Sequence, residues 1–308
     1  MLRLKFLCRR VVSSLRNRTG MERRMFLRNQ TRLSRAIREG VQLVDAMPGV
    51  NVPMVIRDDM FLRSAYTDER FERDSVALIN DTVKRGDTVV DVGANVGVFS
   101  MLFSSLVGPG GKVVAFEPGD FACNLLMRNK QINNFEKLQV VKAGLGEVEG
   151  EAAFYSGNPG MEVYNSLKTP YYVEQNISKF KIVTIPVMRG DTWCQQHCIE
   201  RIDFLKIDVE GGELGVLRGF DTFLRERRIG TVLLELTHRF SKAFGYQPSD
   251  VTSMLRDYGY RWCKLGAFGE LTRLEGDTSD EEPLYVATLA HPFFRRGGTC
   301  PKQTLLWT

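Results

Sequence analysis

An alternation of short apolar runs with helical segments, between residues 88 and 236, is the feature of this sequence that most limits its fold. The apolar runs are rich in β-branched residues, and segments of about 10–15 residues with helical periodicity separate them. Buried parallel strands joined by right-handed helical crossovers produce this pattern. The expected strands are 88–92, 112–117, 138–143, 203–208 and 231–236, and the expected helices are 98–107, 121–133 and 213–228.

The segments on either side of this core predict further elements and a division of the chain. A chain of 308 residues that is 43% hydrophobic can bury one large core. Extended stretches are expected at 54–56 and 60–63, helices at 73–83 and 250–258, and strands at 260–265 and 284–289. The expected units are a basic segment 1–40, a lead-in cap 41–80, an α/β domain 81–290 with an insertion at about 150–200, and a tail 291–308.

Positive charge is concentrated at the beginning of the chain. Residues 1–38 contain 12 Lys and Arg and one acidic residue, which leaves 30 basic and 36 acidic residues in the rest. A net acidic domain is not expected to bind nucleic acid. Leu4, Leu7, Val11 and Leu15 recur at helical spacing among arginines, which predicts a basic amphipathic helix. It is interpreted as a solvated extension, a peripheral contact with anionic membranes, or an organellar import signal.

Cysteine usage and hydropathy indicate the kind of cellular compartment in which the protein is expected. Six cysteines spread over the chain favour a reducing, cytoplasmic setting over a disulfide-rich secreted one. No apolar run approaches the ~20 residues of a membrane-spanning helix. Cys194, His197 and Cys198 lack a second ligand pair at zinc spacing, so ordinary thiols are expected there and no metal.

A glycine-bearing turn follows the first strand of the alternation. Asp91 closes the strand, and Gly93, Ala94, Asn95 and Gly97 lead the chain into a helix. Glycines suit such a turn because a ligand can then approach the backbone closely. Glu117 ends the next strand, 24 residues after Gly93. An acid in that position can accept hydrogen bonds from the ribose hydroxyls of a nucleoside-bearing cofactor.

The spacing of the glycines separates two kinds of cofactor. The turn reads G-x-x-x-G and lacks the three glycines that hold a pyrophosphate in NAD sites. S-adenosylmethionine (SAM) has no pyrophosphate, and Asp91 suits its α-ammonium group, directly or through water. The alternatives are an NAD(P)-dependent oxidoreductase, a non-catalytic adaptor that keeps only the fold, and a plain turn without a ligand.

Three sequence segments, in this order, resemble those of a known family. They are VVDVGANVGVFS, then VVAFEP with a helix ending in NKQIN, then IDFLKIDVEGGELGVLRG. Over about residues 70–240 the chain resembles the FkbM family of class I SAM-dependent methyltransferases. The resemblance implies a Rossmann-like, seven-stranded, mostly parallel sheet with helices on both faces and its last strand antiparallel. It also implies SAM as methyl donor and O-methylation of a sugar, polyketide or other hydroxylated small molecule.

Carried over by position, the resemblance implies where SAM binds. It places SAM against Gly93, Asn95 and Gly97, its ribose on Glu117, and its adenine near Ala143 to Leu145.

The acceptor side is expected beyond the carboxyl ends of the later strands, where ligands bind in open α/β sheets. Asp208 and Glu210 follow the fourth strand, and Glu235 and His238 follow the fifth. Asp208 is the first candidate for general base or substrate anchor and His238 the second. Glu210 is a candidate as well, although it and Glu213 could simply complement a helix N-terminus. A divalent metal bridging Asp208 and Glu235 is an alternative that is not expected.

The loop after the fourth strand and the insertion bear on the acceptor. Enzymes that methylate exocyclic base nitrogens resemble one another in an Asn/Asp-Pro-Pro-aromatic turn, whereas this chain has Asp-Val-Glu-Gly at 208–211. Base N-methylation is therefore disfavoured. Tyr164, Asn165, Tyr171 and Tyr172 of the insertion are expected to form part of the acceptor pocket, where the aromatic faces would suit stacking on a sugar, or to form a satellite hydrophobic cluster.

Overall fold

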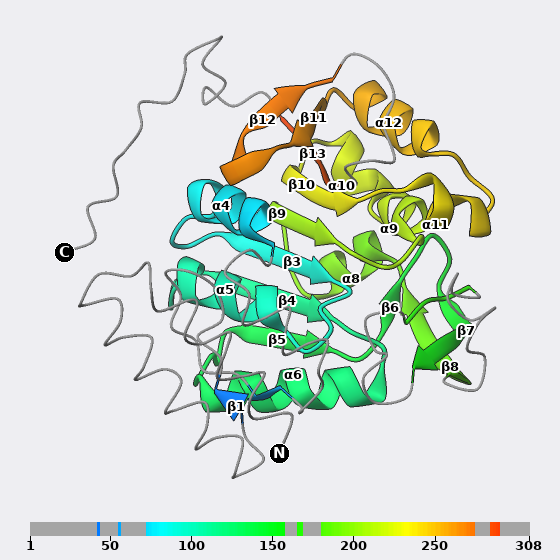
Figure 1. Cartoon of the computed structure of the whole chain (residues 1–308). Helices are drawn as coiled ribbons and strands as arrows, with labels where there is room; N and C mark the ends of the chain where they lie inside the picture. Colours follow the sequence, from blue (N-terminus) through cyan, green and yellow to red (C-terminus); the bar gives the residue numbers. More distant parts are fainter. Residues whose placement is uncertain are drawn as a thin grey trace, which may run out of the picture.

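The computed structural model describes residues 72–157, 165–168, 180–274 and 284–289, together with the backbone of 42–43 and 55–56 (Figure 1). Several predictions lie outside these ranges. They concern the basic segment 1–40, the extended stretch 60–63, the aromatic residues Tyr164, Tyr171 and Tyr172, and the tail 291–308. The stretch predicted at 54–56 contains β2 (Val55–Ile56), which pairs antiparallel with β1 (Gln42–Leu43).

A twisted sheet forms the centre of the described residues, and it has eight strands there. Five neighbouring strands run parallel, and three antiparallel pairings extend the sheet beyond them. The order is β12 (Leu271–Arg273), β11 (Arg261–Leu265), β13 (Leu284–Thr288), β10 (Ile229–Glu235), β9 (Ile202–Ile207), β3 (Thr88–Val92), β4 (Lys112–Phe116) and β5 (Leu138–Val141).

The Rossmann-like fold, with its mostly parallel sheet and antiparallel last strand, is confirmed. The expected number of seven strands is wrong by one, because β12 adds a short edge strand. A 3₁₀ turn (Ala267–Gly269) reverses the chain after β11, and the backbone N–H of Gly266 donates to the Glu270 carbonyl oxygen at 2.8 Å. The reversal brings residues 271–273 back into register with β11.

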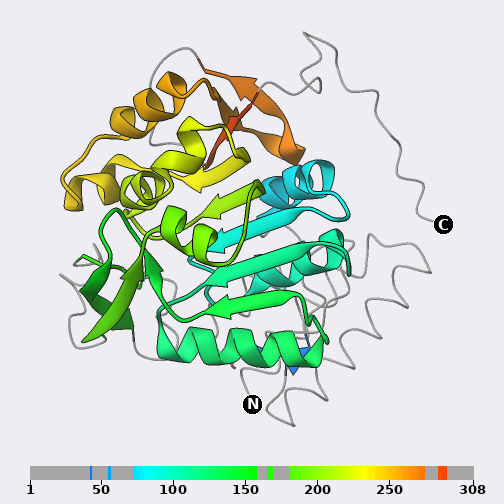
Figure 2. The same cartoon turned by 180° about the vertical axis from the view of Figure 1, so that it is seen from behind.

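Helices cover both faces of the sheet (Figures 1 and 2). On one face lie α4 (Arg73–Thr82), α5 (Val98–Val107) and α6 (Asp120–Ile132), whose apolar side chains share a core with alternate strand residues. On the other lie α8 (Gly190–Gln196), α9 (Glu213–Gly219), α10 (Asp221–Arg225) and α12 (Pro248–Asp257). Because both faces are buried, the strands are apolar on both sides, as parallel strands usually are.

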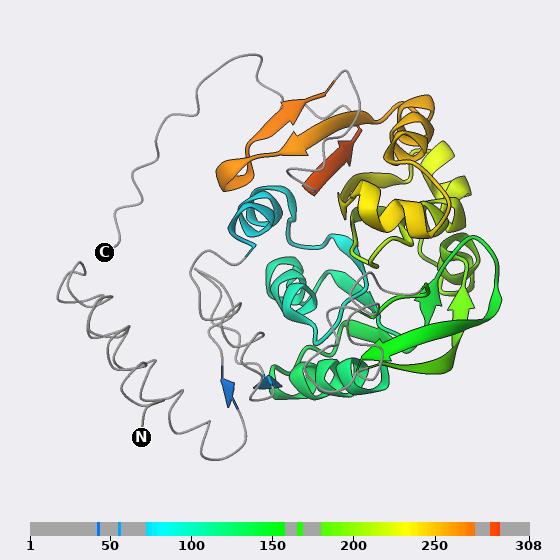
Figure 3. The same cartoon turned by 45° about the vertical axis from the view of Figure 1, so that its right-hand side comes forward.

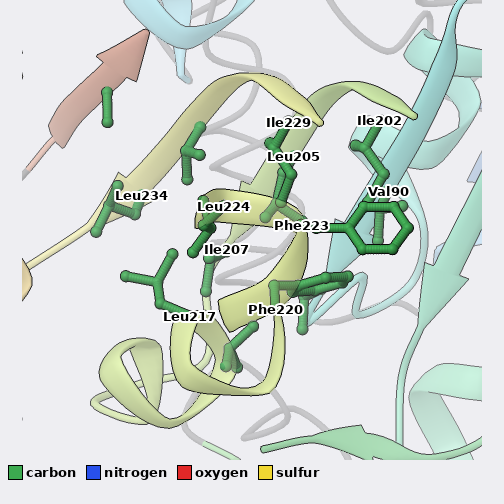
Figure 4. Close-up of a cluster of buried hydrophobic side chains, with 14 of the residues drawn as sticks. Val90, Ile202, Leu205, Ile207, Leu217, Phe220, Phe223, Leu224, Ile229 and Leu234 are labelled. Atoms are coloured by element: carbon green, nitrogen blue, oxygen red, sulfur yellow. The ribbon is translucent and has the colours of Figure 1, made fainter. Parts of the chain in front are cut away.

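The helix predicted at 213–228 is two helices, so that expectation needs correction. Phe220 separates α9 from α10 and is fully buried in the second core, where Figure 4 shows it beside Phe223 and Leu217. The carboxylate of Asp191, on α8, accepts hydrogen bonds from the backbone N–H groups of Thr222 and Phe223 at 2.8 and 3.1 Å. A carboxylate in that position satisfies donors that a continuous helix would use internally, and so starts a new helix.

The insertion contributes a second, smaller sheet among the described residues. Its strands are β6 (Gly144–Leu145), β7 (Gly150–Gly157) and β8 (Phe180–Met188), in the order β6-β8-β7. Figures 1 and 3 show it beyond the carboxyl ends of the parallel strands. The hydroxyl of Ser166 donates to the backbone oxygen of Glu210 at 3.2 Å, which ties the insertion to the loop after β9.

One further helix, α11 (His238–Ala243), follows β10 and has no counterpart in the sequence expectations. Its N-cap is Thr237, whose hydroxyl oxygen accepts from the backbone N–H of Phe240 at 3.3 Å. Across the described residues, no helix is both long and apolar enough to cross a lipid bilayer.

Candidate active site

The turn after β3 is packed directly against the loop after β9. Gly93 has a φ of +78°, and a Cβ atom there would lie 1.8 Å from the backbone oxygen of Asp208. The backbone N–H of Asp208 in turn donates to the carbonyl oxygen of Val92 at 3.0 Å. Only glycine fits this approach. The predicted cofactor turn and the proposed acceptor loop are therefore in direct contact, and we call the contact between Gly93 and Asp208 the shared wall.

Glu117 lies beside that turn, as its spacing from Gly93 predicts. Its side chain is 5% exposed, and its two carboxylate oxygens each accept one backbone N–H at 2.8 Å, one from Asn95 and one from Gly119. Burial raises its pKa to about 7, although the two hydrogen bonds oppose the rise. Each carboxylate oxygen has a further lone pair, so the group can still accept from two hydroxyls.

Asp91 lies in β3, just before the turn, and is 1% exposed. Its Oδ2 accepts a hydrogen bond from the hydroxyl of Ser100 at 2.6 Å. Its Oδ1 is buried and has no hydrogen-bond partner among the described residues. Burial raises the pKa of this carboxyl, while the nearby Lys206 ammonium and the Ser100 hydroxyl oppose the rise. A buried acceptor without a partner is unusual in a folded protein, and a bound cationic donor would satisfy it.

Lys206 lies beside both Asp91 and Asp208, and no role for it was predicted from the sequence. In the sheet it is the register partner of Asp91 on β3 and of Leu233 on β10. Its Nζ lies 2.8 Å from Asp208 Oδ2 and 4.6 Å from the centre of the Phe99 ring. The side chain is only 7% exposed.

The charge of Lys206 is maintained by its neighbours. Burial alone would lower its pKa, but the carboxylates of Asp208 and Asp91 raise it to about 12. The site therefore holds a permanent buried cation between two carboxylates. A lysine inside the apolar run FLKI is the signal that could have identified it from the sequence.

A small pocket opens where β9 and β10 end, beside the start of α4. Carboxylates from three segments reach it, along with the Lys206 ammonium, and aliphatic side chains form the rest of its wall. The lining residues are Glu72, Ser75, Lys206, Ile207, Asp208, Leu233, Leu234, Glu235 and Leu284. Its place at the carboxyl ends of parallel strands is where open α/β sheets bind ligands.

The predicted acceptor residues take different positions around this pocket. Asp208 lines it and is half-buried. Glu210, in the left-handed backbone region with φ +54°, is close by but does not line it. Burial, and then the charges of Asp208, Glu235 and Glu213, raise the pKa of Glu210 well above its usual range. His238 is an exposed residue at the start of α11 and does not line the pocket either.

Glu213 has structural partners. Its Oε1 accepts from the backbone N–H of Gly211 at 3.0 Å, and its Oε2 accepts from the hydroxyl of Tyr246 at 2.9 Å. The carboxylate lies in the first turn of α9, where it also complements the helix dipole. These contacts fit the structural interpretation of this residue.

The structure also describes three further residues that the sequence predicted to be near the cofactor or the acceptor. Ala143 and Leu145, expected near adenine, are both buried. Asn165 lies next to the segment that follows Glu117, since a Cβ on Gly119 would come within 2.9 Å of its Nδ2.

The cysteine cluster takes ordinary packing positions. Cys194 is buried and Cys198 is exposed. The Nδ1 atom of His197 lies 2.8 Å from the Trp193 carbonyl oxygen, and its ring stacks on that of Trp193. Within the described ranges, no three His, Cys, Asp or Glu side chains are grouped so that they could hold a metal ion.

The sheet order, the glycine turn and the adjacent acid define a methyltransferase fold of the Rossmann-like class. The family model described as the methyltransferase FkbM domain matches residues 91–262, which is more than half of the chain. The chain belongs to this family of methyltransferases, and the resemblance inferred from the sequence is confirmed.

Three of the curated relatives share between a quarter and a third of the aligned residues with this chain. The chain is 30% identical over 204 residues to Methyltransferase 1 of Beauveria bassiana, covering 60% of this chain and 77% of that protein. It is 27% identical over 210 residues to the hexuronic acid methyltransferase AglP of Haloferax volcanii, covering 68% and 75%. It is 29% identical over 250 residues to the 31-O-demethyl-FK506 methyltransferase FkbM of Streptomyces tacrolimicus, covering 74% and 86%.

Proposed function

We propose that this protein is a SAM-dependent O-methyltransferase that methylates a hydroxyl group of a sugar, a glycan or another small hydroxylated acceptor. The observation that carries the proposal is the wall shared by the Gly93 turn and Asp208. It puts a cofactor turn and a pocket with polar side chains next to each other, as methyl transfer requires, because catalysis of an in-line displacement depends largely on positioning.

The residues of the turn fit SAM. When bound, SAM supplies a methyl group on a cationic sulfur. The unpartnered Oδ1 of Asp91 suits the α-ammonium group, and Glu117 keeps lone pairs for the ribose hydroxyls. The proposed cofactor-binding residues are Asp91, Gly93, Ala94, Asn95, Gly97, Glu117, Ala143 and Leu145.

The acceptor class is supported by the pocket and by the names of two relatives. One is named for hexuronic acid and the other for an oxygen position of FK506, so the first name refers to a sugar acid and the second to methylation at an oxygen. In this chain the pocket has room for about one water-sized group, so only a single hydroxyl of the acceptor would enter it, next to carboxylates and a serine hydroxyl that can hydrogen-bond to that group. Asp208, at the junction with the cofactor turn, is the proposed anchor for the acceptor.

Titration calorimetry with SAM, its demethylated product and NAD(H) tests the donor half of the proposal. Binding of the first two and not of NAD(H) is expected, since the turn lacks a pyrophosphate cradle. Transfer of a labelled methyl group to a panel of methyl hexosides and methyl hexuronides then tests the acceptor half. Binding of NAD(H) alone would indicate an oxidoreductase, and binding of none of these would indicate an adaptor.

The basic segment 1–38 extends the proposal to a peripheral contact with anionic membranes. Each Lys or Arg near an anionic surface contributes about 1 kcal/mol, and the segment has 12 of them. Deleting it should abolish sedimentation with anionic liposomes and leave methyl transfer in solution nearly unchanged. Equal sedimentation of the full chain with neutral and anionic liposomes would contradict the contact.

A further inference from the structure

The two carboxylates that β9 and β10 bring to the pocket differ in their partners. Asp208 is held in an ion pair, because its Oδ2 lies 2.8 Å from the Lys206 ammonium. Glu235, the last residue of β10, lines the same pocket opposite Leu284 in the register, and its carboxylate makes no hydrogen bond or ion pair with any residue that the structure describes. Lys206 thus fixes one carboxylate, and the other is available to a ligand.

This difference assigns different chemistry to the two carboxylates. The carboxylate of Asp208 is held in one orientation by the buried Lys206 ammonium, which suits an anchor for the acceptor. A partly buried carboxylate without a paired cation is a stronger base, since burial disfavours its charge. A general base works best when its pKa lies near the working pH.

We propose that Glu235 is the general base that accepts the proton of the acceptor hydroxyl, and that Lys206 is a positioning residue that holds Asp208 as the anchor of the acceptor. The inference rests on the proposed function. In the step, the acceptor oxygen bonds to the methyl carbon as the carbon–sulfur bond breaks, and that electron pair stays on sulfur. The hydroxyl proton passes to the Glu235 carboxylate, which later releases it to water.

The charged groups around Glu235 give the step a pH dependence. Burial, and then Asp208 and Glu72, raise its pKa to about 8, while Lys206 opposes the rise and Glu213 adds to it. Glu210 also interacts with Glu235. The carboxylate is the basic form, so turnover should increase as pH rises through about 8 and then level off.

The decisive variant is Glu235→Gln, which keeps the size of the side chain and removes its basicity. Turnover at pH 8, with the best acceptor of the hexoside panel, should fall by ~10²–10⁴-fold, the usual contribution of a positioned base. The increase with pH should also disappear, while the SAM dissociation constant changes little. Glu200→Gln is the matched control, because it removes one carboxylate from the exposed segment before β9.

Two more variants test the positioning role. Asp208→Asn should raise the acceptor KM more than it lowers kcat, and should move the increase with pH to lower pH without removing it, because Asp208 raises the pKa of Glu235. Lys206→Met should move that increase to higher pH, because Lys206 lowers the pKa of Glu235, and Lys206→Arg should restore it. A purely structural lysine would not move the pH profile of the folded fraction. If Lys206→Met does not fold, the Asp208→Asn and Glu235→Gln profiles still decide the assignment.

A measurement without turnover complements these assays. In protein labelled with ¹³C at its glutamate carboxyls, the signal missing from Glu235→Gln identifies Glu235, and it should titrate near pH 8. A midpoint near 4.3, the value of an ordinary glutamate, would overturn the assignment.

The outcomes separate this inference from the proposed function. A wild-type protein that transfers methyl groups, with a Glu235→Gln variant that keeps both rate and pH profile, overturns the inference alone. A wild-type protein that neither binds SAM nor methylates any acceptor overturns both.

Discussion

The two halves of the candidate site are built in different ways. On the candidate cofactor side, one continuous segment supplies the turn, and the carboxylate of Glu117, directly after β4, accepts a backbone N–H of that turn. On the acceptor side, the pocket draws its polar groups from the start of α4 and from the ends of β9 and β10. The cofactor side depends mainly on backbone geometry, and the acceptor side depends on side chains brought together by the sheet register.

The difference has a consequence for variation and specificity. A turn that requires glycine and backbone donors cannot change much without losing its shape. A pocket of separate side chains can change one residue at a time while the sheet stays intact. Family membership therefore indicates the reaction more directly than it indicates the acceptor.

The largest effect should come from breaking the shared wall with Gly93→Ala. The new Cβ would lie 1.8 Å from the Asp208 backbone oxygen, at a φ of +78°. We expect a loss of about 3 kcal/mol or more in the free energy of unfolding, because backbone must move and strain is added. SAM binding by any folded fraction should also be weakened. Urea unfolding and calorimetry measure the two effects.

Gly86→Ala provides the matched control for that variant. Gly86 has a similar φ of +90°, but a Cβ there would meet nothing within 4 Å. The substitution should therefore cost only the left-handed backbone penalty, about 1–2 kcal/mol, and should leave SAM binding unchanged. Equal losses in the two variants would mean that the contact between Gly93 and Asp208 has no energetic importance.

A smaller effect, confined to the cofactor side, is expected from Glu117→Gln. The amide keeps one acceptor oxygen for the backbone and loses the charge that strengthens hydrogen bonds to ribose hydroxyls. SAM affinity should fall by at least about 10-fold, with the protein still folded. Glu117→Ala would be a poorer test, because it would also leave the N–H groups of Asn95 and Gly119 without their acceptor.

An unchanged SAM dissociation constant in folded Glu117→Gln would remove the ribose assignment. The acceptor side provides an internal comparison, since Glu235→Gln should leave SAM affinity nearly unchanged. If both variants weakened SAM binding equally, the two halves of the site would not be separable as described.

The sequence was informative where a structural role is local. The strands, the glycine turn and the acid of β4 follow from periodicity and spacing within about 30 residues, and the structure places them together. Glu117 could be predicted because strand, turn and next strand form one βαβ unit. The division of α9 from α10 could not be predicted, because it depends on the carboxylate of Asp191, about 30 residues earlier in the chain.

The acceptor side shows where reasoning from sequence fails. Asp208 was identified because it ends a strand, but Lys206 looks like an interruption of an apolar run until the register sets it opposite Asp91. His238 was a reasonable candidate by residue type, yet it begins α11 on the surface and does not line the pocket. Which side chains converge depends on register between strands that are distant in sequence, and composition does not encode that register.

The effect that changes most gradually with conditions is the dependence of stability on pH, which compares the two halves through one carboxyl from each. Burial is the first cause in both cases, raising the pKa of Glu117 to about 7 and that of Glu235 to about 8. In the unfolded chain both groups ionise near 4.3. Between that value and about 8 the folded protein holds protons that the unfolded chain has lost, so stability should fall as pH rises.

Urea unfolding at intervals from pH 5 to 9 measures this slope, which is at most about 1.4 kcal/mol per pH unit for each titrating group. Glu117→Gln should flatten it mainly below pH 7 and Glu235→Gln up to about pH 8, because each removes one carboxyl that contributes to the slope. Glu200→Gln, on the exposed segment before β9, should keep the wild-type slope. If Glu235→Gln kept it too, Glu235 would titrate alike in the folded and unfolded protein, and the acceptor side would lose its proposed base while the cofactor side stood unaffected.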